Sequence, residues 1–413
     1  MPDPSTVLPI ELLQKIFKHY LLDWPNADVA APLFNNPLKQ QPLFENRQTQ
    51  VRYLTPGPVQ SLDLSYGLWV LGKVNRAWRN ATLSSETLWS TVRITFSSQP
   101  QWFQDLVWDR AIRKISFSPD SNIPSKILTE ILSRSGSAPL SITLSLPVEM
   151  PREEILADAV SRSLFVLLSE QSHRWQWMEL TVPTMIWEDF VQISPSRLET
   201  LRRLHATVQG GPFLFQIIGV CTSVVDLKIS VTHWKSHTAL PPIPIMMPFL
   251  QYLDIGSSQC DVLKAITAPS LKSLRLQTRG YQSGMPSFCS GFVDFIQRSS
   301  CSNSVVALDL SGGTCSCREV IEILSRTPSG DTSSPSLLPN LGTLLFDGML
   351  ALGRADLDLF LDMVEFRIAG RLRNVRIGHV FGADIENLKG RLSYLNSLPG
   401  VAIEFDEVPD RGF

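Results

Sequence analysis

The fold is decided by a short pattern that recurs along the middle of the chain: residues 224–229 read VVDLKI, residues 249–255 read FLQYLDI, and residues 270–276 read SLKSLRL. Apolar and polar residues alternate in each stretch, which is the period of a half-buried β-strand. Similar stretches begin at Pro139, Trp177, Leu201, Val305, Asn340 and Leu372. The sequence therefore predicts a series of short strands.

Segments with helical spacing lie between these strands. Their apolar residues recur three and four positions apart, as in residues 160–171, 213–221, 292–300, 317–327 and 357–366. Strand and helix therefore alternate along most of the chain, which predicts an α/β fold.

The strands also recur at a nearly regular interval. Steps of about 21 to 26 residues separate the central apolar residues Leu180, Leu204, Leu227, Leu253 and Leu274. Longer steps of about 31 to 36 residues, which indicate insertions, lead on to Leu308, Leu344 and Val375. Because a leucine-rich repeat has about 20 to 29 residues, the sequence predicts an irregular leucine-rich-repeat solenoid, or horseshoe. The rival architecture, a doubly wound enzyme fold, has no phosphate-binding turn to support it.

The beginning of the chain has a different pattern. Residues 8–17 read LPIELLQKIF, and their apolar spacing predicts a helix that starts near Pro9. A second amphipathic helix, bent at Gly72, is predicted over residues 68–83. A strand over residues 92–96 ends this helical region.

A proline-rich stretch separates the two helical segments. Prolines recur between residues 25 and 58, where they remove hydrogen-bond donors and block a continuous helix. An inserted loop is therefore predicted at about residues 24–67. Two domains follow from these patterns: a small all-α domain over residues 1–98, and the repeat region over residues 99–413.

Two motifs give the first domain a family resemblance. LPIELLQKIF at residues 8–17 and KVNRAWRNATLSSETLWSTV at residues 73–92 resemble the F-box pattern. That pattern opens with a Leu-Pro-x-Glu helix and continues with a Val-Cys-Arg-x-Trp-Arg helix followed by Leu-Trp, and Asn75 stands at its cysteine. The arrangement is similar to a large fungal F-box-like family in which a variable loop splits the F-box and irregular leucine-rich repeats follow.

The resemblance implies a substrate-recognition adaptor of an SCF-type cullin-RING ubiquitin ligase. The F-box would bind a Skp-type adaptor, and through it a cullin, while the repeats bind a target protein. The resemblance assigns the adaptor-binding face to Leu8, Pro9, Leu12, Leu13, Ile16, Val74 and Trp78. Two alternatives remain open: these residues are the core of a small helical domain, or the chain is a leucine-rich-repeat scaffold without ligase association.

Strand alternation predicts which residues meet the target. Side chains between the buried positions should reach the concave face of the solenoid, and a slip of one residue in the register would invert the assignment. The predicted target-binding residues are Lys228, Gln251, Lys272, Arg275 and Asp309.

Composition limits the possible partners. The chain has 413 residues, of which 44% are hydrophobic and 18% charged, as in folded globular proteins. Its formal net charge of -2 provides no field to collect phosphates, so we expect no nucleic-acid partner. It contains no apolar run of about 18 residues and no signal-peptide pattern. We therefore expect an intracellular protein of the cytoplasm or nucleus, without a membrane contact.

Motifs of catalytic and metal sites are missing from the sequence. It contains no phosphate-binding GxxxxGK loop, no GxGxxG fingerprint, no GxSxG elbow and no HExxH helix, so we expect neither catalysis nor a cofactor. His233 and His237 are followed at once by prolines, and Cys315 and Cys317 lack a CxxC partner, so no metal site is expected. The tryptophans are expected mainly in the core.

Overall fold

The computed structural model describes most of the chain. The described residues are 8–22, 61–62, 67–95, 123–146, 155–209, 212–232, 240–256, 261–277, 287–310, 317–325, 337–346, 354–377 and 385–405. The chain divides into two compact units, Met1–Trp175 and Gln176–Phe413. Helices and parallel strands alternate along it, so the predicted α/β class is confirmed. The loop predicted at about 24–67 lies almost wholly outside the described residues.

The first unit combines short helices with two parallel strands. Its described elements are α1 (Ile10–Leu22), α3 (Gly67–Val74), α4 (Arg76–Leu83), α5 (Glu86–Trp89), β1 (Thr91–Thr95), α7 (Ile123–Arg134), β2 (Leu140–Ser145), α8 (Ile155–Glu170) and the 3-10 turn η2 (Ser172–Arg174). The predicted helix near Pro9 and the predicted strand near residue 92 are confirmed by α1 and β1. Strands β1 and β2 pair in parallel, with Val92 opposite Ile142.

The predicted single helix over residues 68–83 is corrected to two helices. The break falls at Asn75 and not at Gly72, because Asn75 has an extended backbone and begins a new helix. Its side-chain oxygen accepts a hydrogen bond from the backbone N–H of Trp78 at 2.9 Å. Such an N-cap satisfies a helix donor that would otherwise lack a partner.

Helices α1 and α4 pack together through both apolar and polar contacts. Phe17 is buried and its ring centre lies 5.0 Å from that of Trp78. Gln14 donates hydrogen bonds to the carbonyl of Ala81 and to the hydroxyl of Ser84. These contacts fix which side of α1 faces the rest of the unit.

The helical segment also contacts residues beyond position 98. The guanidinium of Arg134, in α7, lies 5.0 Å from the ring centre of Trp69 and 4.6 Å from that of Trp89. Glu86 accepts a hydrogen bond from the backbone N–H of Ser137. The boundary at 98 stays a prediction, but a fragment that ends there would lose these contacts.

The second unit is built around a large parallel sheet whose strands follow one another in the order β3-β4-β5-β7-β9-β10-β11-β12-β13. The strands are β3 (Trp175–Thr181), β4 (Arg203–Gln209), β5 (Asp226–Thr232), β7 (Tyr252–Gly256), β9 (Ser273–Gln277), β10 (Ala307–Asp309), β11 (Thr343–Phe346), β12 (Asn374–Ile377) and β13 (Ala402–Phe405). Every strand predicted between Trp177 and Leu372 is confirmed. β13 and the small sheet of β6 (Ile245–Met246) and β8 (Ile266–Thr267) were not predicted.

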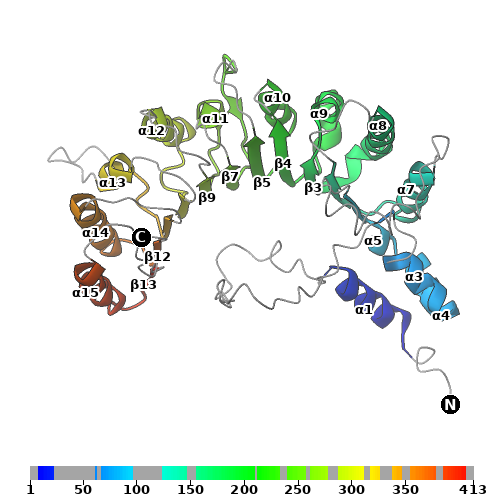
Figure 1. Cartoon of the computed structure of the whole chain (residues 1–413), viewed down its shortest axis with the longest axis horizontal. Helices are drawn as coiled ribbons and strands as arrows, with labels where there is room; N and C mark the ends of the chain where they lie inside the picture. Colours follow the sequence, from blue (N-terminus) through cyan, green and yellow to red (C-terminus); the bar gives the residue numbers. More distant parts are fainter. Residues whose placement is uncertain are drawn as a thin grey trace, which may run out of the picture. The chain divides into compact units, whose positions relative to one another are not determined.

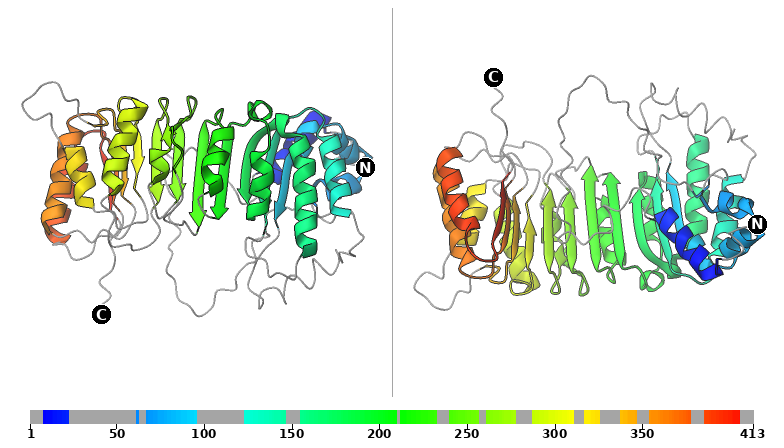
Figure 2. Two further views of the ribbon diagram at one scale, coloured as in Figure 1. Left: turned by 90° about the horizontal axis from the view of Figure 1, so that it is seen from above. Right: turned by 90° about the horizontal axis from the view of Figure 1, so that it is seen from below.

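The helices of the second unit lie on one face of this sheet. They are α9 (Thr184–Val191), α10 (Pro212–Val220), α11 (Asp261–Lys264), α12 (Ser287–Ser299), α13 (Cys317–Ser325), α14 (Arg354–Ile368) and α15 (Ile385–Asn396), with the 3-10 turn η3 (Pro195–Leu198) before β4. Figure 1 labels them, and Figure 2 shows the helices in front from one side and the strands in front from the other. We call the face opposite these described helices the open face.

One buried row of apolar residues runs through the second unit. Its members pair with one another from strand to strand: Met178, Leu204, Leu227, Leu253, Leu274, Leu308, Leu344, Val375 and Ile403. All of them are buried. Leu180, predicted as the member from the first strand, pairs instead with Ala206, so Met178 takes its place. A strand repeats every two residues, and both Met178 and Leu180 therefore point toward the helices.

Arginine side chains connect separate elements in both units. Each guanidinium donates to backbone carbonyls at or beyond the end of an earlier helix, where helical partners run out. Arg174 donates to Ser135 and Ala138, Arg298 to Leu263 and Ile266, and Arg367 to Leu324, Leu337 and Leu338. Burial lowers the pKa of Arg367, and these carbonyls compensate for the lost water.

We predict that Arg367→Met lowers the free energy of unfolding by about 2 to 4 kcal/mol, because several buried carbonyls lose their donor. Arg367→Lys should recover little of this loss, since an ammonium cannot reproduce the planar fork of a guanidinium. The measurement is urea unfolding followed by circular dichroism. Arg371→Met, at an exposed position three residues beyond α14, is the control and should change stability by less than about 0.5 kcal/mol.

Candidate protein-binding surfaces

Helix α1 presents aliphatic side chains away from its own unit. Leu12 and Ile16 are four residues apart on one side of the helix, and Leu8 precedes them by the same step. All three are exposed, at 40 to 45% of their full surface. We call Leu8, Leu12 and Ile16 the α1 stripe.

The structure divides the predicted adaptor-binding residues into two groups. The α1 stripe, Pro9 and Val74 are exposed, and Val70 continues the apolar surface one turn before Val74. Trp78 is half-buried against Phe17. Leu13 is only 2% exposed, so its assignment to the adaptor-binding face is corrected to the core of the unit. It lies on the side of α1 that faces inward together with Phe17.

A row of charged residues crosses the open face of the second unit. Each member directly follows a residue of the buried apolar row, so its side chain points to the opposite side of the sheet. The members are Glu179, His205, Lys228, Asp254, Arg275, Asp309, Arg376 and Glu404. We call these residues the charged row. Only β11 places an apolar residue, Leu345, in that register among the described strands.

Opposite charges pair across neighbouring strands of this face. Lys228 Nζ lies 3.7 Å from an Asp254 carboxylate oxygen, and Arg275 Nε lies 2.9 Å from Asp309. In the adjacent register, Arg203 Nε lies 4.0 Å from Asp226. Pairing of this kind is expected where strands are about 4.8 Å apart, because side chains directly opposite one another reach contact distance.

Burial shifts the pKa of ionisable groups on this face. It raises the pKa of Asp254 above its ordinary value, and the positive charges of Lys228 and Arg275 oppose this rise. It lowers the pKa of His205, an effect that Glu179 opposes and Lys228 reinforces. The indole of Trp177 also meets the imidazole ring of His205 edge-on, with ring centres 6.3 Å apart. The side chains of Asp254 and His205 are therefore partly withdrawn from water on the open face.

Three of the five predicted target-binding residues belong to the charged row: Lys228, Arg275 and Asp309. Gln251 and Lys272 lie outside the row, because each stands one residue before the start of its strand, and their role in target binding stays a prediction. Their backbones connect successive turns, through the hydrogen bond from the Lys272 N–H to the Gln251 carbonyl.

Sequence reasoning missed Glu179, His205, Asp254, Arg376 and Glu404, although the signal was present. A charged or ionisable residue stands between two apolar ones in LHA, LKI, LDI, LRL, LDL, VRI and IEF. Aligning these triplets by their first residue gives most of the charged row directly. The pairing of opposite signs between strands then becomes visible in the sequence.

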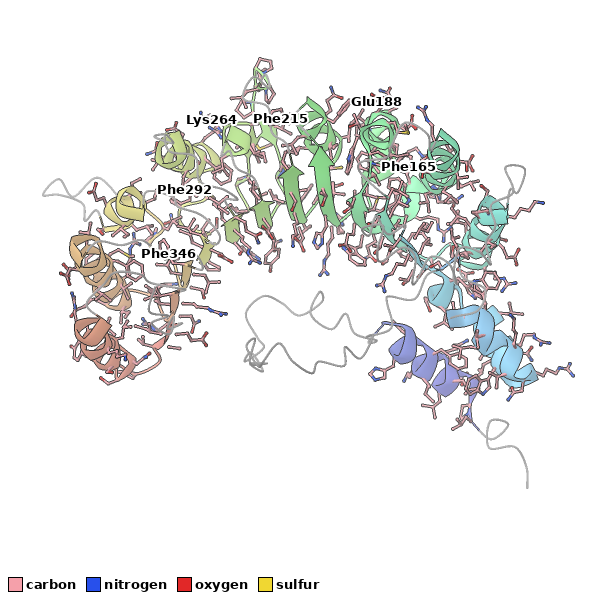
Figure 3. The ribbon with its side chains drawn as sticks, viewed as in Figure 1. Phe165, Glu188, Phe215, Lys264, Phe292 and Phe346 are labelled. Carbon is pink, nitrogen blue, oxygen red and sulfur yellow. The ribbon has the colours of Figure 1, made fainter. Side chains whose placement is uncertain are left out.

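Other candidate sites give no binding surface in the part of the chain that the structure describes. Trp175 and Trp187 are buried, as predicted for core residues, whereas Trp102, Trp108 and Trp234 lie outside the described residues, as do His233, His237 and Cys315. Cys221 and Cys301 are buried free thiols. Figure 3 shows Glu188 and Lys264 on the helix side of the second unit, and Phe292 and Phe346 are buried.

Two further observations apply to the described residues alone. They contain no group of three or more His, Cys, Asp or Glu side chains arranged to hold a metal ion. None of their helices has the length and apolar character that crossing a bilayer requires.

We predict that His205→Gln reduces the pH dependence of stability. Burial holds the folded-state pKa of His205 below its ordinary value of 6.5, so the unfolded chain takes up this proton first as the pH falls. The free energy of unfolding of the wild type should therefore decrease through the His205 titration below about pH 6.5, and the variant should lose less. Urea unfolding at several pH values measures the difference, and equal decreases in both proteins would contradict this prediction.

Comparisons with known protein families and curated proteins give no match that would identify the partners of these surfaces. No protein-family model matches the chain. No curated protein matches its sequence either. What the chain can bind therefore follows from its own geometry: an exposed aliphatic stripe in the first unit, and a charged open face in the second.

Proposed function

We propose that this chain is a substrate-recognition adaptor of an SCF-type ubiquitin ligase. The observation that carries the proposal is the α1 stripe: Leu12 and Ile16 are exposed on a helix whose opposite side is already packed, and exposed Leu8 lies just before the helix begins. Its three residues lie in the segment LPIELLQKIF, residues 8–17, which resembles the start of an F-box. A Skp-type adaptor, and through it a cullin, is the partner that this resemblance implies.

The energetics of the stripe support a binding role. Burying a Leu or Ile side chain contributes about 1.5 to 3 kcal/mol relative to leaving it in water. Leu8, Leu12 and Ile16 are all exposed and recur at steps of four residues, whereas single exposed apolar residues are ordinary on protein surfaces. A partner that covered the stripe would gain this free energy without refolding α1.

The second half of the proposal is that residues 99–413 form a leucine-rich-repeat solenoid that holds a target protein. Successive parallel strands, helices on one face, and a buried apolar row at intervals from 21 to 36 residues support it. The open face would then be the target-binding surface. Ubiquitin transfer would be performed by other subunits inside the cell, so we propose no catalytic residue or cofactor here.

Co-purification of the full chain with a Skp-type adaptor tests this proposal. The wild type should retain the adaptor at micromolar concentration, and Leu12→Asp or Ile16→Asp should abolish retention, because a charge would be buried without a partner. Val166→Asp is the matched control: Val166 is an exposed aliphatic residue of α8 in the same unit. Circular dichroism should show that all three variants stay folded.

The outcomes separate the alternatives. An adaptor that binds the wild type and Val166→Asp, but neither stripe variant, supports the proposal. If the folded wild type retains no adaptor, the ligase role is wrong, and an interaction scaffold without ligase association takes its place.

A further inference from the structure

We propose that the open face around β4, β5, β7 and β9 binds an acidic peptide segment of its partner. The recognition groups are the side chains of Arg203, Lys228 and Arg275. The inference rests on the proposed role of the open face as the target-binding surface, and it adds the chemistry of the target.

The cations of this face lie further out than the anions with which they pair. The side chain of Arg203 is 60% exposed and that of Asp226 30%, and the values for Lys228 and Asp254 are 44% and 16%. Arg275 and Asp309 follow the same order, at 28% and 12%. The three ion pairs are neutral in sum, but their cations are the more exposed partners. An approaching partner therefore meets mainly the positive charges.

The inner carboxylates keep these cations in place. Asp254 and Asp309 are largely covered, and burial is the main cause of the raised pKa of Asp254. They therefore act as anchors beneath the cations more than as contacts for a ligand. An ammonium has three N–H donors and a guanidinium five, so each cation can bind an inner aspartate and an outer carboxylate together.

The spacing suits an extended peptide that runs across the strands. Lys228 and Arg275 occupy one register on strands separated by β7, which places their backbones about 10 Å apart. An extended chain covers this distance in about three residues. Carboxylates spaced by three residues could therefore meet successive cations, while Tyr252, exposed in the adjacent register, offers an aromatic surface.

An acidic peptide is favoured over a nucleic acid by the charge of the whole chain. The formal net charge is -2, so a long polyanion would gain from the local cations but be repelled elsewhere. A short peptide with separated carboxylates meets the cations alone. Its affinity should decrease as salt is raised from about 50 to 300 mM, because these charges are exposed to solvent.

Fluorescence anisotropy with the full chain tests the inference. The probe is a labelled peptide of about ten residues with Glu at every third position and Ser between, long enough to span the three cations. Comparison probes replace Glu by Gln or Lys, and a single-stranded thymidine oligonucleotide of similar length represents nucleic acid. The Glu peptide should bind, and the other three should bind at least about tenfold more weakly.

Paired substitutions test the residues while leaving no buried carboxylate unpaired. The row variant combines Lys228→Gln with Asp254→Asn and Arg275→Gln with Asp309→Asn, and it should bind the Glu peptide at least about tenfold more weakly.

The control variant combines Lys264→Gln with Glu188→Gln on the helix side, which also keeps the net charge. Its affinity for the Glu peptide should stay within about twofold of that of the wild type. If the row variant does not fold, Arg203→Gln replaces it and should weaken binding about threefold.

Each result decides the matter. The inference would be overturned by unchanged peptide binding in the folded row variant, by an equal loss of binding in the control, or by tighter binding of the oligonucleotide.

Leu12→Asp should bind the peptide normally, and the row variant should retain a Skp-type adaptor. Peptide binding without adaptor retention would thus refute the ligase role alone, and adaptor retention without peptide binding would refute this inference alone.

Discussion

The structure of the second unit depends on one constraint: each strand can bury its apolar side chains only against the helix side of a sheet that its neighbours extend. Leu227, Leu253 and Leu274 meet in one register because of it. A slip of one residue would move such a leucine to the open face and a charged residue into the core. Burial of the apolar row therefore fixes the register of the whole sheet, one strand at a time.

The charged row is a consequence of the same constraint. Once Leu253 and Leu274 point inward, Asp254 and Arg275 must point outward beside one another, since successive side chains alternate. Their charges are then close enough to interact across strands. In each of the three cross-strand ion pairs of the open face the cation is the longer and more exposed partner, so these pairs turn their positive charge outward, although the formal net charge of the chain is -2.

Buried backbone carbonyls at helix ends also find hydrogen-bond donors in a way that recurs along the chain. Helix ends leave backbone carbonyls without partners, and Arg174, Arg298 and Arg367 supply donors to such carbonyls from elements later in the chain. In the first unit Asn75 satisfies the start of a helix, and the guanidinium of Arg134 lies over two tryptophan rings. These contacts join separate elements within each unit.

The sequence by itself determined the element types and most strand positions, because periods of two and of three to four residues are local properties of the chain. It also marked Leu12 and Ile16, but it could not separate them from Leu13, since only the packing of α1 against α4 decides which side of a helix is covered. It left the register open by one residue, so Gln251 and Lys272 were predicted beside Lys228 and Arg275. Only the tertiary structure, by pairing strands far apart in sequence, aligned Met178 with Leu204 and brought Lys228 next to Asp254.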